Sequence, residues 1–282
     1  MSFGNKPVDG GHLLLSRDEV EALDLTVEQG NRFIRRIYGS AEFIRGQERY
    51  CLWLDDQHIE DIKKISAVWQ RIKMVREMRL ASPKAATVEI AATPHRFGEV
   101  RQTGDETVIV VPSVSSEARD YLPVGYAPQG TIVSNLAFAL YDAPLWNMAL
   151  IASRLHLVWI GTVCGKMKTD FRYSNTLGWN TFPVPLLTEQ NKADLIFCAQ
   201  DILLARESHF PATIAELYAT NTMPENLRHA HERNDEVLER IYIGRRFKND
   251  TERLEKLFEL YMKMKAVPAK AKKAMKATRG NK

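Results

Sequence analysis

The run from Ala143 to Thr162 is apolar on almost every side, and it limits the fold more than any other stretch of the chain. Its large apolar residues are spread around the whole helical turn: Trp146, Met148, Leu150, Ile151, Leu155, Leu157, Val158, Trp159 and Ile160. With Pro144 at its start, this pattern predicts one long helix that is buried all round. We expect His156 within it to be a core histidine, because no second His or Cys stands at metal-binding spacing.

Length and composition allow one large or two modest domains around that helix. The chain has 282 residues, of which 45% are hydrophobic, and this is enough for a sizeable core. The three cysteines, Cys51, Cys164 and Cys198, are widely spaced in apolar surroundings, which argues against a disulfide framework or a zinc cluster. No signal sequence or membrane-spanning run is visible. We therefore expect a soluble, cytoplasmic protein with no metal site and no membrane partner.

The distribution of charge matters more than the net charge of +4. Eight Lys and Arg residues lie from Lys263 onward without a single acid, so the rest of the chain carries −4. Net charge therefore gives no argument for nucleic-acid binding by the body as a whole. A local cluster, Arg71, Lys73, Arg76 and Arg79, gives one helix a basic outer face, which either follows a phosphate backbone or is merely solvated.

The first part of the chain is predicted to be mainly helical, after an irregular lead-in that ends at Leu15. Ser16-Arg-Asp-Glu19 is a capping box, so a helix should run from Arg17 to about Leu25. The other predicted elements are helices at 27–37 and 58–80, the latter ending before Pro83, and a buried strand at 50–54.

Residues 84–142 change to short β-branched runs separated by glycine and proline. The runs lie at 87–91, 98–102, 107–111 and 131–135. They predict an antiparallel sheet with hairpins, one of which turns at Gly104-Asp105.

Beyond Phe182-Pro-Val-Pro185, whose two prolines favour an extended exit, the pattern is helical again. Helices are predicted at 193–208, 211–218, 224–240 and 250–264, followed by a basic disordered tail at 266–282. Asp235 and Glu236 with Arg240 are expected to be surface pairs. The whole chain is thus predicted to be α+β: a mixed or antiparallel sheet domain with a buried long helix, followed by a helical domain.

The segment Gly165–Asn175, directly after the apolar run, combines cations, one carboxylate and two aromatic rings. If it is extended, Lys168, Asp170 and Arg172 form one row on one side. A Lys or Arg donor matches the acceptors of a guanine edge, and an Asp accepts from the amino group of the paired cytosine. The row therefore suits contact with DNA bases. The competing interpretation is an exposed strand whose charges only solvate it.

No catalytic signature accompanies this segment. The sequence lacks a glycine-rich loop after a strand, a phosphate-binding Gly-x-x-x-x-Gly-Lys motif, a Gly-x-Ser-x-Gly elbow and a His-Glu-x-x-His motif. The residues alone favour a binding module over an enzyme.

A series of short motifs occurs in order along the chain: Pro7-Val-Asp-Gly-Gly-His-Leu13, Glu42-Phe-Ile-Arg-Gly46, Arg49-Tyr-Cys-Leu-Trp-Leu54, Ser115-Ser-Glu117, Tyr121-Leu-Pro123, Arg172-Tyr-Ser-Asn175, Asn180-Thr-Phe-Pro183 and Tyr242-Ile-Gly-Arg-Arg-Phe247. Over residues 1–265 they resemble the C-terminal part of the MmeI-like family of single-chain restriction and modification proteins. One departure is Ala118, where similar family members carry a second Arg.

This resemblance implies two domains with different functions along the chain. Residues 1–185, with a helical lead-in at 16–81, resemble a target recognition domain for double-stranded DNA, and residues 186–265 resemble a helical C-terminal domain. In the family, a methyltransferase domain transfers a methyl group from S-adenosylmethionine to adenine N6. Its Asn-Pro-Pro-aromatic motif and cofactor glycines have no counterpart here. We therefore expect no catalytic residue or cofactor in this chain, and a methyltransferase domain in cis or on another chain.

The resemblance also implies roles for individual residues. The segment 168–172 is similar to a set of base-reading positions in the family, which supports Lys168 and Asp170 as readers of a G·C pair and Arg172 as reader of a neighbouring base. Asn135 is a further base-reading candidate, through adenine. Phosphate contacts are assigned to Lys84, Arg96, Arg119, Arg154 and Lys166. Tyr173 and Trp179 are expected in the core rather than stacked on an opened base.

Two other interpretations remain open from the sequence. The chain could be a separate DNA specificity subunit, since its Phe-Pro-Val-Pro exit into a helix resembles the ends of recognition domains in type I specificity subunits. It could also be a helical interaction protein without a nucleic-acid role, in which case Lys168 and Asp170 are ordinary surface residues.

Overall fold

The computed structural model describes the backbone of residues 1–279 and the side chains of residues 1–266. The chain folds into two compact units, each assembled from two stretches of sequence. Unit 1 comprises Met1–Ser113 and Gly125–Ala143, and unit 2 comprises Val114–Val124 and Pro144–Lys282. The disordered tail expected at 266–282 differs from the structure, in which the last helix, Asp250–Arg279, includes the backbone up to residue 279; residues 280–282 lie outside the described part of the chain.

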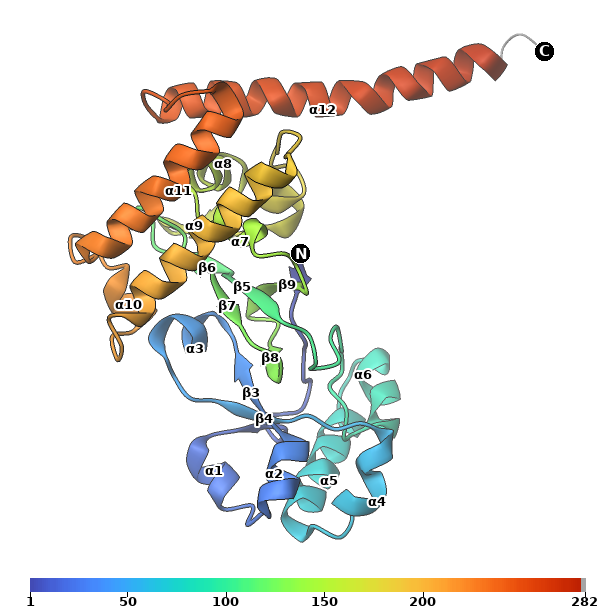
Figure 1. Cartoon of the computed structure of the whole chain (residues 1–282). Helices are drawn as coiled ribbons and strands as arrows, with labels where there is room; N and C mark the ends of the chain where they lie inside the picture. The colour runs from blue at the N-terminus through green and yellow to red at the C-terminus, as the bar shows by residue number, and fades with distance from the viewer. Residues whose placement is uncertain (280–282) are drawn as a thin grey trace. The chain divides into compact units, whose positions relative to one another are not determined.

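Two four-stranded sheets form the centre of unit 1 (Figure 1). The first has the order β1-β9-β5-β7 and is antiparallel throughout. The second has the order β2-β4-β3-β8, in which β3 and β8 run parallel and the other neighbours antiparallel. The strands are β1 (Ser2–Phe3), β2 (Leu14–Leu15), β3 (Ile34–Tyr38), β4 (Tyr50–Leu52), β5 (Val108–Pro112), β7 (Gly125–Ala127), β8 (Thr131–Val133) and β9 (Ala137–Tyr141).

Strand β5 lies between two neighbours, and all five of its residues are buried. A continuous β-branched run is typical of such a central strand. Short helices complete unit 1: α1 (Arg17–Glu21), α2 (Val27–Phe33), α3 (Ser40–Arg45), η1 (Asp56–His58), α4 (Ile59–Ile62), α5 (Ser66–Leu80), α6 (Ala85–Glu89) and η2 (Ile90–Ala92). The capping box predicted at Ser16 is confirmed, because Ser16 and Glu19 each accept a backbone hydrogen bond from the other residue.

Helix α5 has a buried side that includes a charged residue. Val68, Ile72 and Val75 follow the predicted spacing of three or four, and Arg79 continues it with no exposed surface. The Arg79 guanidinium donates to the backbone carbonyls of Val8, Pro7, Ile90, Thr93 and Arg96 at 2.7–3.0 Å. Placing Arg79 on a basic outer face was therefore wrong, because its side chain is buried and its guanidinium donates hydrogen bonds to backbone oxygens inside the unit.

Three predicted elements of unit 1 are wrong, and for two of them a contact with a distant segment gives the reason. The helix expected at 27–37 ends at Phe33, because Ile34–Tyr38 is taken into the sheet between β4 and β8. The strand expected at 87–91 is helix α6, and two carbonyls just beyond it bind Arg79. The helix expected at 58–80 is interrupted before Ser66, where Ile65 is extended.

The region around Gly104 also differs from the prediction. No hairpin turns at Gly104-Asp105, since β5 pairs with β7 and β9. Instead, the Glu106 carboxylate accepts hydrogen bonds from the amides of Thr103 and Gly104. The run 98–102 contributes only an isolated bridge between Glu99 and Lys6.

Unit 2 is mainly helical, with one small sheet of order β10-β11-β6. Its elements are β6 (Val114–Ser115), α7 (Trp146–Ile151), α8 (Arg154–Val163), β10 (Gly165–Met167), β11 (Asp170–Arg172), the π-helical turn η3 (Asn175–Trp179), α9 (Glu189–Glu207), α10 (Ile214–Leu217), α11 (Glu225–Ile243) and α12 (Asp250–Arg279). Helices α7 and α8 are buried, as predicted. They are two helices rather than one, because Ser153 is extended and caps α8 through the amide of His156.

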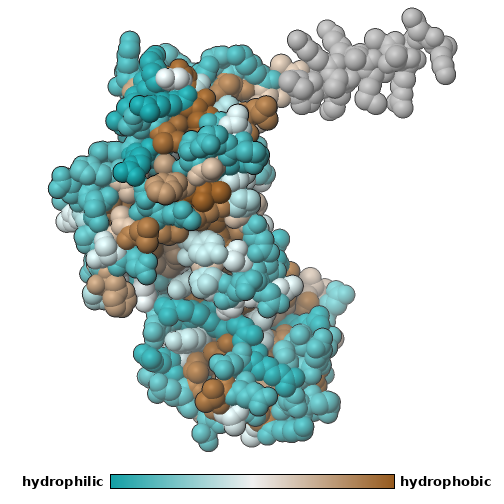
Figure 2. Space-filling view, viewed as in Figure 1, coloured by the Kyte–Doolittle hydropathy of each residue, from teal (hydrophilic) through white to brown (hydrophobic). Residues whose placement is uncertain are grey.

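The predicted α+β class is confirmed by this combination of antiparallel, mixed and helical parts. Hydrophilic residues cover most of the face shown in Figure 2, and apolar residues reach it in separate patches. Among the described residues, no helix is long and apolar enough to cross a membrane.

Candidate nucleic-acid interface

The segment singled out in the sequence is a β-hairpin with a two-residue turn. In its register Met167 faces Asp170, Lys166 faces Phe171 and Gly165 faces Arg172, so Lys168 and Thr169 form the turn. Lys168 has φ = 58°, in the left-handed region that favours glycine. The single row of Lys168, Asp170 and Arg172 on one strand is therefore wrong. Asp170 and Arg172 share one face of β11, and Lys168 occupies the tip.

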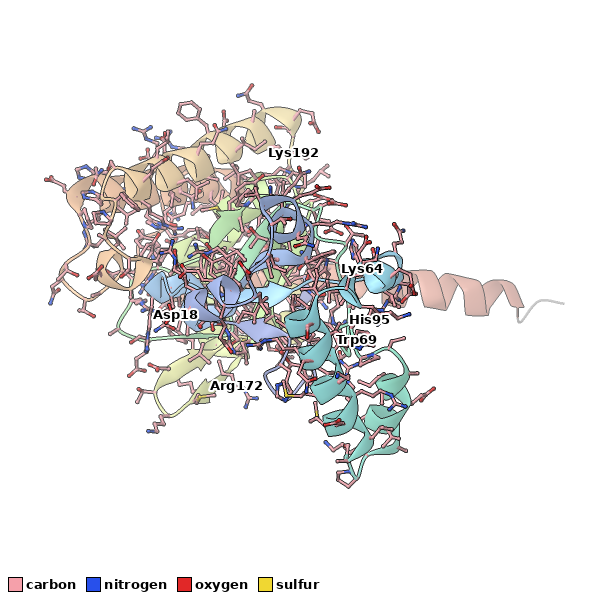
Figure 3. All side chains as sticks on the ribbon, turned by 90° about the horizontal axis from the view of Figure 1, so that it is seen from below. Asp18, Lys64, Trp69, His95, Arg172 and Lys192 are labelled. Atoms are coloured by element: carbon pink, nitrogen blue, oxygen red, sulfur yellow. The ribbon has the colours of Figure 1, made fainter. Side chains whose placement is uncertain are left out.

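The two faces of the hairpin have different surroundings. Phe171 packs on helix α8, where a Cβ atom at Gly161 would lie 3.1 Å from the phenyl ring. Lys166 on the same face lies over the Phe171 ring, with Nζ 5.8 Å from its centroid. The opposite face carries Met167 and Arg172, both exposed. Figure 3 shows the Arg172 side chain extending away from the hairpin.

Tyr173, directly after β11, anchors the hairpin to α8. It is buried, as predicted, and its hydroxyl lies 2.9 Å from His156 Nε2. His156 has no exposed surface, and burial lowers its pKa to about 3, so the ring is neutral at physiological pH. The prediction of a core histidine is confirmed, although its Nδ1 has no hydrogen-bond partner within the described part of the chain.

The predicted phosphate-contacting cations of unit 2 are Arg119, Arg154 and Lys166, and they lie in different settings. Lys166 Nζ lies 3.1 Å from the Glu117 carboxylate, and both are exposed. Burial lowers the pKa of Arg119, and the nearby Asp170 carboxylate opposes that shift. Arg119 thus lies beside the hairpin, and its Nη1 donates a hydrogen bond to Ser115 Oγ on β6 at 3.3 Å. The Ser115-Ser-Glu117 motif did not indicate that Glu117 pairs with Lys166, because only the fold brings the two side chains together.

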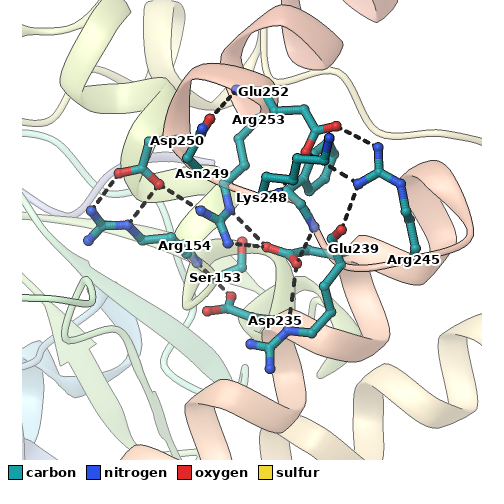
Figure 4. A network of polar contacts seen from close by, with 12 residues as sticks. Ser153, Arg154, Asp235, Glu239, Arg245, Lys248, Asn249, Asp250, Glu252 and Arg253 are labelled. Carbon is teal, nitrogen blue, oxygen red and sulfur yellow. Dashed lines mark hydrogen bonds and ion pairs between the residues drawn. The ribbon is translucent and has the colours of Figure 1, made fainter.

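Arg154 is part of a different structure, the polar network in Figure 4. Its guanidinium makes two hydrogen bonds to Asp250, at 2.7 and 3.3 Å, and these raise its pKa. Arg253 links Asp250 to the buried Glu239. Of the five proposed phosphate contacts, Arg154 is therefore the one with the strongest structural role.

The remaining predicted residues lie in unit 1. Lys84 is exposed and forms no ion pair within residues 1–266, whereas Arg96 Nη2 lies 2.8 Å from Asp56. Asn135 belongs to a loop whose shape is fixed by hydrogen bonds, since Ser40 and Ser113 both donate to the carbonyl of Leu136. Its half-buried side chain lines a cavity of about 80 Å³.

The residues thus form a hairpin group in unit 2 (Arg119, Lys166, Lys168, Asp170 and Arg172) and separate positions in unit 1 (Lys84, Arg96 and Asn135). No group of three His, Cys, Asp or Glu side chains able to hold a metal ion occurs among the residues described.

Comparison with known families shows to which family the chain belongs. The family model described as the target recognition domain of MmeI matches residues 1–186, and the model of the MmeI C-terminal domain matches residues 187–267. The chain therefore belongs to the MmeI family, and the resemblance inferred from its motifs is confirmed.

Two relatives define its place more closely. DNA methyltransferase A of Bacillus subtilis (strain 168) is 40% identical over 264 residues, which cover 94% of this chain and 30% of that protein. A solved structure of the Type IIL restriction-modification enzyme MmeI in complex with DNA matches with a TM-score of 0.87 and 33% identity, over 94% of this chain and 35% of that one. The chain thus spans about a third of the length of either relative.

Proposed function

We propose that this chain is the sequence-specific double-stranded DNA recognition module of an adenine-N6 DNA methyltransferase of the restriction-modification type. The observation that carries the proposal is the match of residues 1–186 to the target recognition domain of MmeI. The likeness to an MmeI structure determined in complex with DNA supports DNA as the partner. The proposed division is a recognition domain at 1–185 and a helical C-terminal domain at 186–265.

Methyl transfer is assigned to a domain outside this chain, in cis or on a second chain, and S-adenosylmethionine is the cofactor of that domain. The relatives leave room for such a domain, because they are about three times as long as the matched region. This chain's own contribution is to bind the duplex and select its sequence.

The hairpin is proposed as the base-reading element. Lys168 at its tip donates to a guanine edge, and Asp170 accepts from the amino group of the paired cytosine. Lys168 is exposed at the tip, and Asp170 is half-buried with the Arg119 guanidinium as its charged neighbour. Arg172, on the same face as Asp170, contacts a neighbouring base, and Asn135 of unit 1 is assigned to an adenine.

The conformation of Lys168 supports this role. A lysine in the left-handed region is strained by about 1–2 kcal/mol relative to glycine, and strained residues cluster at functional sites. At the tip of a short turn, glycine would suit the backbone better. The side chain, rather than the backbone, is therefore the reason for lysine at this position.

The test is selection of duplexes from a randomised pool at two salt concentrations, with the wild type, Lys168→Gly and Asp170→Ala. The wild type should enrich a short motif that contains a G·C pair. Each variant should relax the preference at that pair by about 1–3 kcal/mol. Lys168→Gly should change the unfolding free energy by less than about 1 kcal/mol, since relief of strain offsets the flexibility of glycine.

Lys192→Ala is the matched control, because Lys192 pairs with Glu189 on α9, in a different element of unit 2. It should leave the selected motif unchanged. Binding that is equal for all sequences and disappears with salt would contradict the proposal.

A further inference from the structure

One buried carboxylate in unit 2 joins two segments that lie far apart in the sequence. Asp235 Oδ1 accepts a hydrogen bond from the backbone amide of Arg154 at 2.7 Å, and Oδ2 accepts one from the Tyr121 hydroxyl at 3.0 Å. Asp235 is only 4% exposed. Figure 4 shows it beside Arg154 at the edge of the polar network. The expectation that Asp235 is a surface partner of Arg240 was wrong; Glu236 makes that pair.

Both segments held by Asp235 lead directly to the hairpin. Arg154 is the first residue of α8, and the far end of α8 leads through Cys164 into β10. Tyr121 follows β6, whose Ser115 and Val114 pair with Phe171 and Arg172 of β11. The hairpin is thus supported from one side by α8 and from the other by β6. Asp235 thus holds α8 at its first residue and the chain that follows β6 at Tyr121.

Other side chains of α9 and α11 hold the segment 120–124 and helix α7, which precedes α8. Arg206 donates to the carbonyl of Val124 at 2.6 Å, and Arg228 lies 3.2 Å from the Asp120 carboxylate. Asn234, next to Asp235, donates to the carbonyl of Ala149 at 2.9 Å. These residues belong to the region matched by the C-terminal domain model, whereas the segments they hold belong to the region matched by the target recognition model.

We infer that Asp235 and Tyr121 are positioning residues for DNA sequence selection, through which the C-terminal domain sets the orientation of the hairpin. This inference rests on the proposed function of the hairpin. Two strands of three residues have little stability of their own, so the hairpin takes its orientation from α8 and β6. Base hydrogen bonds weaken steeply when geometry is lost, whereas contacts to phosphates carry no sequence information. Loosening Asp235 therefore reduces discrimination more than affinity.

The experiment compares binding of the whole chain to its selected duplex and to a duplex with the hairpin-read pair inverted, at pH 8. The variants are Asp235→Asn, Tyr121→Phe and the double variant. In each single variant the dissociation constant for the inverted duplex divided by that for the selected duplex should fall by roughly tenfold. The affinity for the inverted duplex should stay within about twofold of the wild-type value. The double variant should lose no more than the larger single loss, because both residues act through one contact.

Asp201→Asn is the matched control. Asp201 on α9 also bridges to α11, through Arg233 at 2.7 Å, but it is not one of the contacts to 114–124 or α8. The ratio of dissociation constants of Asp201→Asn should equal that of the wild type.

An unchanged ratio in Tyr121→Phe overturns the inference, even if Asp235→Asn does not fold. The inference is also overturned if Asp201→Asn lowers the ratio of dissociation constants as much as Asp235→Asn does. Any substitution that weakens the contact between α9 and α11 would then reduce discrimination. If the wild-type chain binds both duplexes equally while binding DNA, the proposed function and the inference fall together. If the wild type discriminates and the positioning variants do so equally well, only the inference falls.

Discussion

At the scale of single residues, Arg79 illustrates how a charged side chain can serve the fold alone. Its guanidinium is fully buried and bonded only to backbone carbonyls. Burial lowers its pKa, and Asp9 nearby opposes that shift. The five carbonyls come from 7–8 and 90–96, so Arg79 ties the lead-in of unit 1 to the segment after α6.

Replacing Arg79 by alanine should lower the unfolding free energy of unit 1 by about 3–5 kcal/mol, because five buried acceptors lose their partner. Arg76→Ala, on the exposed side of the same helix, should change it by no more than about 0.5 kcal/mol. Urea unfolding followed by circular dichroism measures both. Equal effects of the two substitutions on the unfolding free energy would show that the buried hydrogen bonds of Arg79 do not stabilise unit 1.

At the scale of elements, the contact between α11 and the start of α8 depends on the ionisation of Asp235. Desolvation raises the pKa of this carboxyl to about 7, against the hydrogen bonds from Arg154 and Tyr121, which lower it. The folded protein therefore binds a proton here that the unfolded chain, with a pKa near 3.8, has already released.

This difference predicts a pH dependence of stability with a definite sign. Between about pH 4 and pH 7 the folded state holds more protons at Asp235 than the unfolded state, so its contribution falls as pH rises. The difference in unfolding free energy between wild type and Asp235→Asn should be largest near pH 4. It should shrink by an amount on the order of 3 kcal/mol by pH 7. Denaturant titrations at several pH values measure it, and a constant difference would contradict the shift.

At the scale of the whole molecule, the body outside the basic end carries a net negative charge. Attraction to a phosphate backbone must therefore come from particular cations rather than from the overall field. Lys84 is the clearest such cation in unit 1, since it is exposed and without an ion pair among the residues described.

Lys84→Ala should weaken binding to every duplex alike and reduce the slope of log affinity against log salt by about one unit. Arg154→Ala should act mainly on stability, because Arg154 is bound to Asp250. Fluorescence anisotropy at four salt concentrations separates the two effects. A change in base preference in Lys84→Ala would rule out a pure phosphate contact.

Local features of the fold could be predicted from the sequence because they depend on neighbouring residues. The cap at Ser16, the strand at Tyr50 and the end of α5 before Pro83 each follow from side chains within a few positions. The strand β3 could not be predicted, since its helical appearance is overridden by pairing with β4 and with the distant β8.

In the candidate site, too, local features could be predicted from the sequence, whereas features that depend on distant segments could not. The composition of 165–175 indicated a contact surface, but the turn at Lys168 depends on register, which the alternation of residues cannot give. The burial of Asp235 depends on α11 packing against segments more than eighty residues earlier. Its neighbour Glu236 has a similar sequence context and lies closer to solvent.

The hairpin has one more consequence, for how such proteins diversify. Phe171 and Tyr173 fix the hairpin to α8, while Arg172 lies on the opposite face and is exposed. Substitutions at Arg172 are therefore expected to have little folding cost, whereas position 168 favours residues that tolerate the left-handed region. If the hairpin reads bases as proposed, descendants of one ancestral chain can acquire new DNA targets by substitutions in the hairpin, with the remainder of the molecule inherited unchanged.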